Sequence, residues 1–292
     1  MIQEPSVLPP SHISAMRNVM MATNLTNLVF GGSPAEAGAF PMQVYISFAK
    51  RQGGNYMCGG TLISTTHVLT AAHCTIDMTS PARILAGSVR INDRSANAQW
   101  RNIHSINTHG GYDAKNYRND IAIVEFNPPV VLNRDIQLSK IASDDSMLMM
   151  QPTALVSGFG TYHHQGQESF TSEKLLYAEV KLIPASQCRA WGPLADTQIC
   201  GGASGKGIGG GDSGGPIQVS YNKQLFQVGL TSFGSAEPEK EEFQQDRYPS
   251  VFTRVSKYCD YISRATKGAA SCANISNGND RTPPPKDCVP SQ

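Results

Sequence analysis

Three short segments hold residue types that could together perform nucleophilic catalysis. His73 stands in TAAHC, Asp120 in NDIAIVEF and Ser213 in GDSGGP. A serine hydroxyl is a weak nucleophile, so it needs a neighbouring base to take its proton. Histidine suits that task because its unperturbed pKa is about 6.5. A buried carboxylate beside the histidine would hold the imidazole in the required tautomer.

Each of these signals has an ordinary structural explanation when it is taken alone. A histidine at a strand end is usually structural. An aspartate before a strand is commonly a turn or cap residue, and a serine among glycines commonly belongs to a plain loop. Their joint occurrence in this order is far less expected by chance. The glycines near Ser213 also allow the N–H groups of Gly211 and Ser213 to point at a developing oxyanion.

The elements that must position these residues are short and of β type. Runs rich in Val, Ile, Thr and aromatic residues alternate with Gly- and Pro-rich turns, which is typical of paired antiparallel barrels or a sandwich. A helix is predicted over 255–267, with an apolar face at i, i+3, i+4 and i+7 and a stop at Gly268. The predicted strands are 42–49, 67–72, 120–126, 153–159, 178–183, 216–221, 226–233 and 250–255.

Composition limits the class of protein. The chain has 292 residues, 40% of them hydrophobic, which is enough for a sizeable core and more than one compact core usually needs. A net charge of +1 argues against a nucleic-acid partner, which would require clustered Lys and Arg. No apolar run approaches the roughly 20 residues needed to span a bilayer, so no membrane partner is expected.

The seven cysteines predict disulfides and therefore an oxidising compartment, since none of them forms a CxxC pair. An odd number leaves at least one thiol without a partner in the chain. The first 27 residues contain no basic region followed by an apolar core, so a signal peptide is not visible. Either it is missing from this sequence or export follows another route, and the cysteines favour the first explanation.

Taken together, these motifs resemble the trypsin/chymotrypsin family of serine endopeptidases. The segment VFGGSPAEAGAFPMQV (29–44) resembles the mature N-terminus of that family. CGGTLISTTHVLTAAHC, NDIAIVEF, SGFG, GDSGGP and TSFG follow in the family's order, and the resemblance covers about residues 29–267. It implies an all-β fold of two six-stranded antiparallel Greek-key barrels packed around a cleft, with a C-terminal α-helix.

The resemblance implies a role for each matching residue. His73 would be the general base, Asp120 would orient it and Ser213 would be the nucleophile. The N–H groups of Gly211 and Ser213 would form the oxyanion hole. The implied substrate pocket consists of Gly207, Ile208, Ser232, Phe233, Gly234 and Ser250.

The implied pocket has no charge at its floor. Family members that cut after Lys or Arg carry an aspartate six residues before the serine, where this chain has Gly207. A cationic side chain buried there without a partner would carry a large desolvation cost. We therefore predict cleavage after medium or large apolar residues.

The resemblance also implies synthesis as a zymogen. Val29 matches the residue whose amine is freed on activation, and Asp212 matches the acid that pairs with that amine. Because Leu28 precedes Val29, a trypsin-like activator would not cut there. The hypothesis is that the enzyme itself, or a relative with a similar pocket, makes this cut. The predicted domains are a pro-segment at 1–28, a peptidase domain at 29–267 with barrels at about 29–140 and 154–254, and a flexible tail at 268–292.

Two disulfides follow from the resemblance, Cys58–Cys74 and Cys188–Cys200. Two other common family disulfides are absent with both partners. One would join the positions of Gly209 and the 235–249 loop, and the other those of Ala154 and Val219. Because both cysteines of each disulfide are missing together, their loss indicates a property of this lineage and not random decay.

Cys259 could pair with Cys272 or with Cys288, and the third thiol could pair with another chain or stay free.

Several segments have weaker interpretations. The acidic segment 235–250 is either a solvated loop or a rim that attracts basic substrate. His163 and His164 are expected in a surface loop, where metal binding is only weakly indicated. The loop at 86–100 does not support calcium, so no metal and no cofactor are expected. NLT (24–26) and NIS (274–276) are glycosylation acceptors if the chain is secreted.

The sequence thus predicts a secreted, monomeric serine endopeptidase that acts on peptide or protein substrates, with protein inhibitors as further partners. The alternative is a protease-fold binding protein that has lost activity. Such proteins typically break the catalytic triad, and all three members are present here. A small-molecule-binding β module, the third class, predicts none of these spacings.

Overall fold

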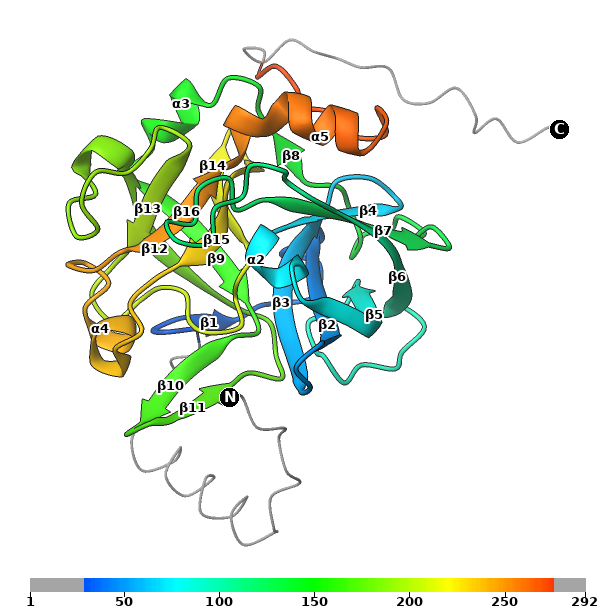
Figure 1. Cartoon of the computed structure of the whole chain (residues 1–292), viewed down its shortest axis with the longest axis horizontal. Coiled ribbons are helices and arrows are strands. Elements are labelled where there is room, and N and C mark those ends of the chain that lie inside the picture. Colours follow the sequence, from blue (N-terminus) through cyan, green and yellow to red (C-terminus); the bar gives the residue numbers. More distant parts are fainter. Residues whose placement is uncertain (1–28, 276–292) are drawn as a thin grey trace, which may run out of the picture.

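The first barrel is a closed sheet whose strands direct alternate side chains into its core. Along β2 (Gln43–Lys50), the side chains of Val44, Ile46 and Phe48 are all buried, because every second side chain of a strand faces the same side. The computed structural model describes residues 29–275, and in them six antiparallel strands close in the order β2-β3-β4-β7-β6-β5 (Figure 1). The others are β3 (Asn55–Leu62), β4 (His67–Thr70), β5 (Met78–Ala86), β6 (Gln99–Thr108) and β7 (Ala122–Asn127).

The second barrel closes because β9 pairs with both β12 and β14. Its six strands follow the order β9-β12-β13-β16-β15-β14, and closure removes the free edges of the sheet. The all-β class and the two antiparallel barrels are thereby confirmed. The strands are β9 (Thr153–Gly158), β12 (Leu176–Pro184), β13 (Gln198–Gly202), β14 (Pro216–Tyr221), β15 (Gln224–Phe233) and β16 (Ser250–Arg254).

Short elements extend or connect the barrels. β1 (Ser33–Pro34) pairs with β12, and β8 (Lys140–Ile141) pairs in parallel with β15. A hairpin of β10 (Thr161–Gln165) and β11 (Glu168–Thr171) projects from the second barrel at the bottom of Figure 1. The short helices are α2 (Ala72–Thr75), α3 (Ser146–Met149), η1 (Ala185–Gln187) and α4 (Pro238–Phe243).

The predicted C-terminal helix is confirmed, with a tighter first turn. Residues Val255–Tyr258 form a 3-10 turn (η2), and α5 (Cys259–Ala265) continues it. The helix ends where Gly268 adopts a φ of 83° and donates its N–H to the Ser263 carbonyl at 2.8 Å. This positive φ is easily adopted by glycine, as the stop signal in the sequence requires.

Apolar packing and buried hydrogen bonds join the two barrels. Beneath α5, Ile262 packs in one cluster with Leu69 from the first barrel and Leu230 from the second. Between the barrels, the Thr61 hydroxyl donates to the Gln227 side-chain oxygen at 2.8 Å, and both residues are buried. A buried polar group needs such a partner, so these bonds fix how the barrels meet.

Three disulfides are present among the described residues, Cys58–Cys74, Cys188–Cys200 and Cys259–Cys272. The first two are those that the family resemblance implies. The third decides between the two partners left open for Cys259, while Cys288 lies outside the described residues. It ties α5 to the segment that follows, where the Ala273 N–H donates to the Ile141 carbonyl at 2.8 Å.

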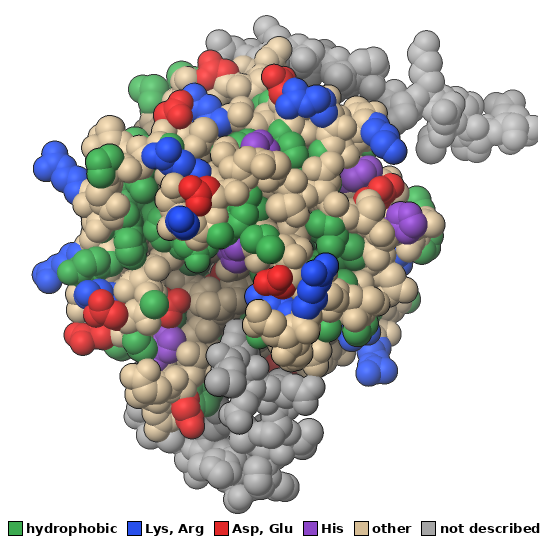
Figure 2. Space-filling model, viewed as in Figure 1, with side chains coloured by type: hydrophobic (Ala, Val, Ile, Leu, Met, Phe, Trp, Pro, Cys, Tyr) green, Lys and Arg blue, Asp and Glu red, His purple; other side chains and the backbone are tan. Residues whose placement is uncertain are grey.

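The predicted pro-segment (1–28), the acceptor NLT and most of the predicted tail also lie outside the described residues. Within residues 29–275 no helix is long and apolar enough to cross a lipid bilayer. On the face seen in Figure 2, basic and acidic side chains are interspersed, without a large basic patch.

Candidate active site

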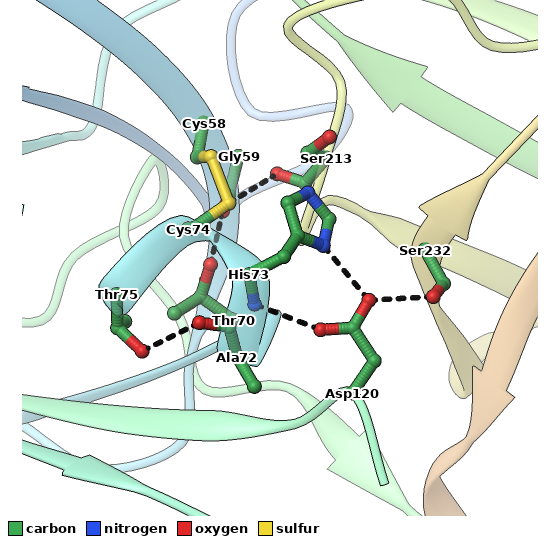
Figure 3. The surroundings of a disulfide bond; sticks show 10 residues. All are labelled: Cys58, Gly59, Thr70, Ala72, His73, Cys74, Thr75, Asp120, Ser213 and Ser232. Carbon is green, nitrogen blue, oxygen red and sulfur yellow. Dashed lines mark hydrogen bonds and ion pairs between the residues drawn. A yellow bond between two sulfur atoms is a disulfide. The ribbon is translucent and has the colours of Figure 1, made fainter. Parts of the chain in front are cut away.

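His73 is held by two hydrogen bonds to one carboxylate. It lies on α2, immediately after β4, and its backbone N–H donates to Asp120 Oδ1 at 2.9 Å (Figure 3). Its ring Nδ1 lies 2.8 Å from Asp120 Oδ2. A carboxylate can only accept at this position when ionised, so Nδ1 carries the proton and Nε2 is left with a free lone pair. The side chain of His73 is 23% exposed, and that of Asp120 is fully buried.

Asp120 connects the two barrels. It precedes β7 of the first barrel, and its Oδ2 also accepts the Ser232 hydroxyl of β15 at 2.5 Å. Its backbone carbonyl accepts the Thr253 hydroxyl of β16 at 2.9 Å. The Asp120 carboxylate is buried away from water. Two hydrogen bonds from His73 and one from Ser232 replace those that water would supply, as a buried charge requires.

Ser213 lies in a turn that packs against β3 and against the end of β4, which leads into the helix with His73. The Ser213 carbonyl accepts the Gly59 N–H at 2.7 Å and lies 3.7 Å from Cys74 Sγ. A Cβ at Gly214 would come within 2.2 Å of the Thr70 hydroxyl, so only glycine permits this approach. In Figure 3, Ser213 and the His73 ring both lie to the right of the Cys58–Cys74 disulfide.

The structure therefore brings the three predicted residues to one place between the barrels. His73 and Asp120 are in direct contact, and the Ser213 carbonyl contacts Cys74, the residue after His73. No hydrogen bond joins the Ser213 hydroxyl to His73 among the described residues. Such bonds are often long before substrate binds.

Asp212, next to Ser213, is a buried acid without a cationic partner among the described residues. Its carboxylate accepts the N–H groups of Gly160 at 2.7 Å and Gly209 at 3.0 Å. Burial raises its pKa to about 7, and the two hydrogen bonds oppose that shift. Val29 is also buried, in the core of the second barrel together with Ile208.

The predicted pocket residues converge, and a residue that the sequence analysis missed fills the space between them. A Cβ at Gly234 would lie 3.0 Å from the Ser250 hydroxyl, so these two positions face each other. The Gln245 side chain, 1% exposed, lies where a Cβ at Gly207 would come within 1.9 Å of its oxygen. No local signal marks Gln245, because it stands in the polar run FQQDRY.

Both the nitrogen and the oxygen of the Gln245 amide are hydrogen-bonded to protein. Its nitrogen donates to the carbonyls of Ile208 and Glu241, both at 2.7 Å. Its oxygen accepts the Ser250 hydroxyl at 3.0 Å. The space beside Gly207 is therefore neutral, and its polar groups are already paired.

A row of aromatic rings extends from His73. Tyr117 lies 5.9 Å from the His73 ring and 5.1 Å from Phe233, and Trp191 lies 5.5 Å from Phe233 between ring centroids. Phe233 was predicted at the site, but Tyr117 and Trp191 were not, because they stand in unrelated loops of the sequence. The row gives the site an apolar wall.

Two expectations about the loops around the site need correction. His163 and His164 lie in the strand β10 and not in a surface loop, because they pair with Phe170 and Ser169 of β11. The acidic segment 235–250 contains α4, and two of its acids face β10. His163 Nδ1 lies 2.9 Å from Glu242, and His164 Nε2 lies 2.7 Å from Glu241.

Among residues 29–275, one group combines three potential metal ligands, Cys58, His73 and Cys74. Both sulfur atoms belong to a disulfide, so no thiolate is available to bind a metal there.

Comparison with known proteins identifies the family. The family model described as Trypsin matches residues 29–262. The chain is 30% identical over 240 residues to chymotrypsin-like elastase family member 1 of Macaca fascicularis, covering 81% of this chain and 88% of that protein. It is 31% identical over 245 residues to chymotrypsin-C of Bos taurus, covering 82% and 90%.

The fold and the site define a serine peptidase built from two β-barrels. The chain belongs to the trypsin family. It is a serine-type endopeptidase, a hydrolase that acts on peptide or protein substrates.

The contact between Gly207 and Gln245 gives a stability prediction. Gly207→Asp should lower the free energy of unfolding by about 1–3 kcal/mol, because the new Cβ overlaps the Gln245 amide and because residues with a side chain rarely adopt the φ of 155° found here. The double variant Gly207→Asp with Gln245→Ala should recover only the part of that loss that the overlap causes. Urea unfolding of the two variants and of Gln245→Ala alone measures the coupling, and an undiminished stability of Gly207→Asp would contradict the packing described here.

Proposed function

We propose that this endopeptidase works through His73, Asp120 and Ser213 and a covalent acyl-enzyme. The observation that carries the proposal is the pair of hydrogen bonds from His73 to the buried Asp120. They leave Nε2 as the only basic nitrogen of the ring, and this nitrogen is the one a serine hydroxyl could use. The ionised Asp120 also stabilises the imidazolium that forms when Nε2 takes a proton.

The steps follow from this arrangement. Ser213 Oγ attacks the scissile carbonyl carbon while His73 Nε2 accepts the hydroxyl proton. The tetrahedral intermediate collapses, the C–N bond breaks, and His73 returns the proton to the leaving amine. Water then attacks the acyl-enzyme while His73 Nε2 accepts a proton from it. The ester C–O bond to Ser213 breaks, His73 returns the proton to Ser213 Oγ, and the carboxylic acid product leaves.

Backbone N–H groups of Gly211 and Ser213 are proposed to stabilise the oxyanion. Gly211 has a φ of 96°, and a Cβ there would lie 2.5 Å from the Met57 methyl group. The positive φ favours glycine at position 211, whereas the flexible Met57 side chain could move aside, and this backbone conformation supports a turn that directs an N–H inward. Donors already oriented in this way need no reorganisation as charge develops on the oxygen.

The direct test of this mechanism uses a serine-directed phosphonate. Active protein should be labelled at Ser213 and lose activity in parallel, whereas Ser213→Ala should not be labelled. Asp120→Asn should lower kcat by about 10⁴-fold, because an amide no longer holds the imidazole in the tautomer that leaves Nε2 free to act as a base. Mass spectrometry locates the label. An unlabelled protein that carries Val29 at its N-terminus would favour the alternative, a protease-fold binding protein without activity.

The pocket supports a preference for apolar residues before the scissile bond. Gly207, Ile208, Gly234, Ser250 and Gln245 carry no charge, so the pocket offers no carboxylate to pair with a cation, and the Gln245 oxygen already accepts the Ser250 hydroxyl. Burying a Lys or Arg side chain there would leave its charge without a partner.

A peptide series that differs only in that residue tests the preference. We expect kcat/KM for Leu, Phe, Tyr or Met to exceed that for Lys or Arg by about 10²-fold or more, corresponding to a desolvation cost of several kcal/mol. Ser213→Ala is the control for contaminating proteases. A preference for Lys or Arg would contradict the pocket proposed here.

The activation proposal rests on Val29 and Asp212. Val29 is 1% exposed, and the Gly207 N–H donates to the carbonyl of its neighbour Phe30 at 3.1 Å. This contact brings the segment after the proposed cleavage site to the pocket wall. Cleavage between Leu28 and Val29 would create an α-amine, and the buried Asp212 carboxylate would be its partner. The ion pair between this amine and the Asp212 carboxylate would stabilise the Ser213 turn. The uncleaved chain lacks that ion pair and is therefore proposed to be the zymogen.

This proposal predicts a pH-dependent stability of the uncleaved chain. The pKa of Asp212 is raised from 3.8 to about 7, so the folded state binds more protons than the unfolded state between these values. The free energy of unfolding should therefore fall as pH rises, by about 3 kcal/mol between pH 5 and pH 8. Urea unfolding of Ser213→Ala, with and without Asp212→Asn, isolates this contribution.

After cleavage the dependence should weaken, because the amine favours the ionised acid. Equal pH profiles with and without Asp212→Asn would refute the role of Asp212. An N-terminus other than Val29 in active material would refute the cleavage site.

We also propose that the protein is extracellular. The three disulfides of the described residues are typical of an oxidising compartment.

A further inference from the structure

Asp120 is the central residue of a tight turn. The Ile121 N–H donates to the Asn119 carbonyl at 2.8 Å, which closes a three-residue turn around Asp120. Asn119 itself has a φ of 54°, in the left-handed region that asparagine adopts more readily than most residues with a side chain. The direction of the Asp120 carboxylate therefore depends on the backbone conformation of the residue before it.

The side chain of Asn119 is held at both of its polar atoms. Its Oδ1 accepts the Tyr258 hydroxyl at 3.0 Å, and its Nδ2 donates to the Gly111 carbonyl at 2.8 Å. Tyr258 is a buried residue of η2, and Gly111 lies in the loop between β6 and β7. One side chain thus ties the turn at Asp120 to that loop and to the C-terminal helical segment.

His109 supports both partners of Asn119. Its ring contacts the Tyr258 ring edge to face, with 5.6 Å between the ring centroids. Its Nδ1 accepts the Gly111 N–H at 3.1 Å, and its backbone N–H donates to the Ile121 carbonyl at 3.1 Å. The partners of Asn119 are therefore fixed relative to each other and to the start of β7.

These contacts support Asp120 from a side that its carboxylate does not use. The carboxylate faces His73 and Ser232 (Figure 3). The contacts of Asn119 instead fix the peptide that precedes Asp120, and Tyr258 also packs in one apolar cluster with Ile121. Because the side chain follows its backbone, a rotation of this peptide would move the carboxylate relative to His73 Nδ1.

We propose that Asn119, held by Tyr258, is a positioning residue for Asp120. The inference rests on the proposed roles of His73, Asp120 and Ser213. Asn119 acts on the reaction only through Asp120, because it fixes the turn that aligns the carboxylate with the imidazole. Such alignment matters because small misplacements of a catalytic group lower the rate strongly.

The Tyr258 hydroxyl gives a sharp test, because a single atom is removed and the ring stays. In the processed enzyme, Tyr258→Phe should lower kcat by about 3- to 10-fold, with KM for an apolar peptide within about threefold. The matched control on α5 is Tyr261→Phe, whose hydroxyl donates to the Asn107 carbonyl of β6 at 2.5 Å. It should leave kcat unchanged. Rates are expressed per active site, counted by phosphonate titration to completion.

Two substitutions separate the side chain of Asn119 from its backbone conformation. Asn119→Gly keeps the positive φ but removes both side-chain bonds, so it should lower kcat at least as much as Tyr258→Phe. Asn119→Ala adds the strain of a left-handed backbone and should lower kcat by about 10- to 100-fold. Combining Asn119→Gly with Tyr258→Phe should cost no more than Asn119→Gly alone, because the hydroxyl has already lost its acceptor.

Proton NMR tests whether the loss of rate acts through Asp120. In processed Ser213→Ala protein, the chemical shift of the His73 Nδ1 proton reports the hydrogen bond to Asp120. Adding Tyr258→Phe should move this resonance upfield at the same pH, since the bond becomes weaker. Adding Tyr261→Phe should leave it in place. A purely structural loss would lower the stability of the protein without moving this resonance.

Each outcome bears on the inference. If Tyr258→Phe has the kcat of Tyr261→Phe, or if it raises KM alone, Asn119 does not position Asp120. If kcat falls while the Nδ1 resonance stays in place, the loss has another cause and the inference is wrong. These results leave the proposed mechanism intact as long as wild-type enzyme is labelled at Ser213. If wild-type enzyme is not labelled, the mechanism fails, whereas the NMR comparison still decides whether Asn119 orients Asp120.

Discussion

The buried carboxylate of Asp120 is the constraint on which the site depends. A charge removed from water is tolerated only when enough donors face it, and the first barrel supplies two of them through His73. The third comes from Ser232 in the second barrel. Neither barrel alone supplies all the hydrogen bonds to this carboxylate. The electrostatic stabilisation of the site therefore depends on how the two barrels pack together. The Thr253 contact to the Asp120 carbonyl adds to the same junction.

Closed barrels explain why the chemistry lies in loops and turns. The strands of a closed barrel are paired on both sides over most of their length, so few of their backbone groups are free, whereas turns can direct N–H groups outward. Turns near a junction must also allow close approach. Gly214 illustrates this, since any side chain there would strike Thr70 and separate the Ser213 turn from the end of β4, which leads into the helix α2 that carries His73.

Sequence patterns predicted those parts of the molecule that have local signals. All eight predicted strands overlap observed ones, but β3, β5, β6 and β13 were not predicted. Glycines interrupt β3 and β13, a proline interrupts β5, and polar residues dominate β6. His73, Asp120 and Ser213 could be predicted because their flanking motifs are distinctive. Gln245 and the Glu241–His164 pair could not be predicted. Their positions depend on contacts between residues that are 37 and 77 positions apart in the sequence, and no local pattern encodes such contacts.

The missing disulfide and the polar contacts around Gly210 have different physical consequences. A disulfide stabilises mainly by restricting the unfolded chain, whereas hydrogen bonds act in the folded state, each contributing about 1 kcal/mol net. Three consecutive glycines raise the entropy that folding must remove from this segment. Thr161 and Asp212 oppose that entropy at separate atoms of the segment. Because the bonds are reversible and shielded to different degrees, the order of the segment depends on all of them together. A glycine-rich wall can therefore be ordered without its covalent link, provided that β10 stays in contact with it.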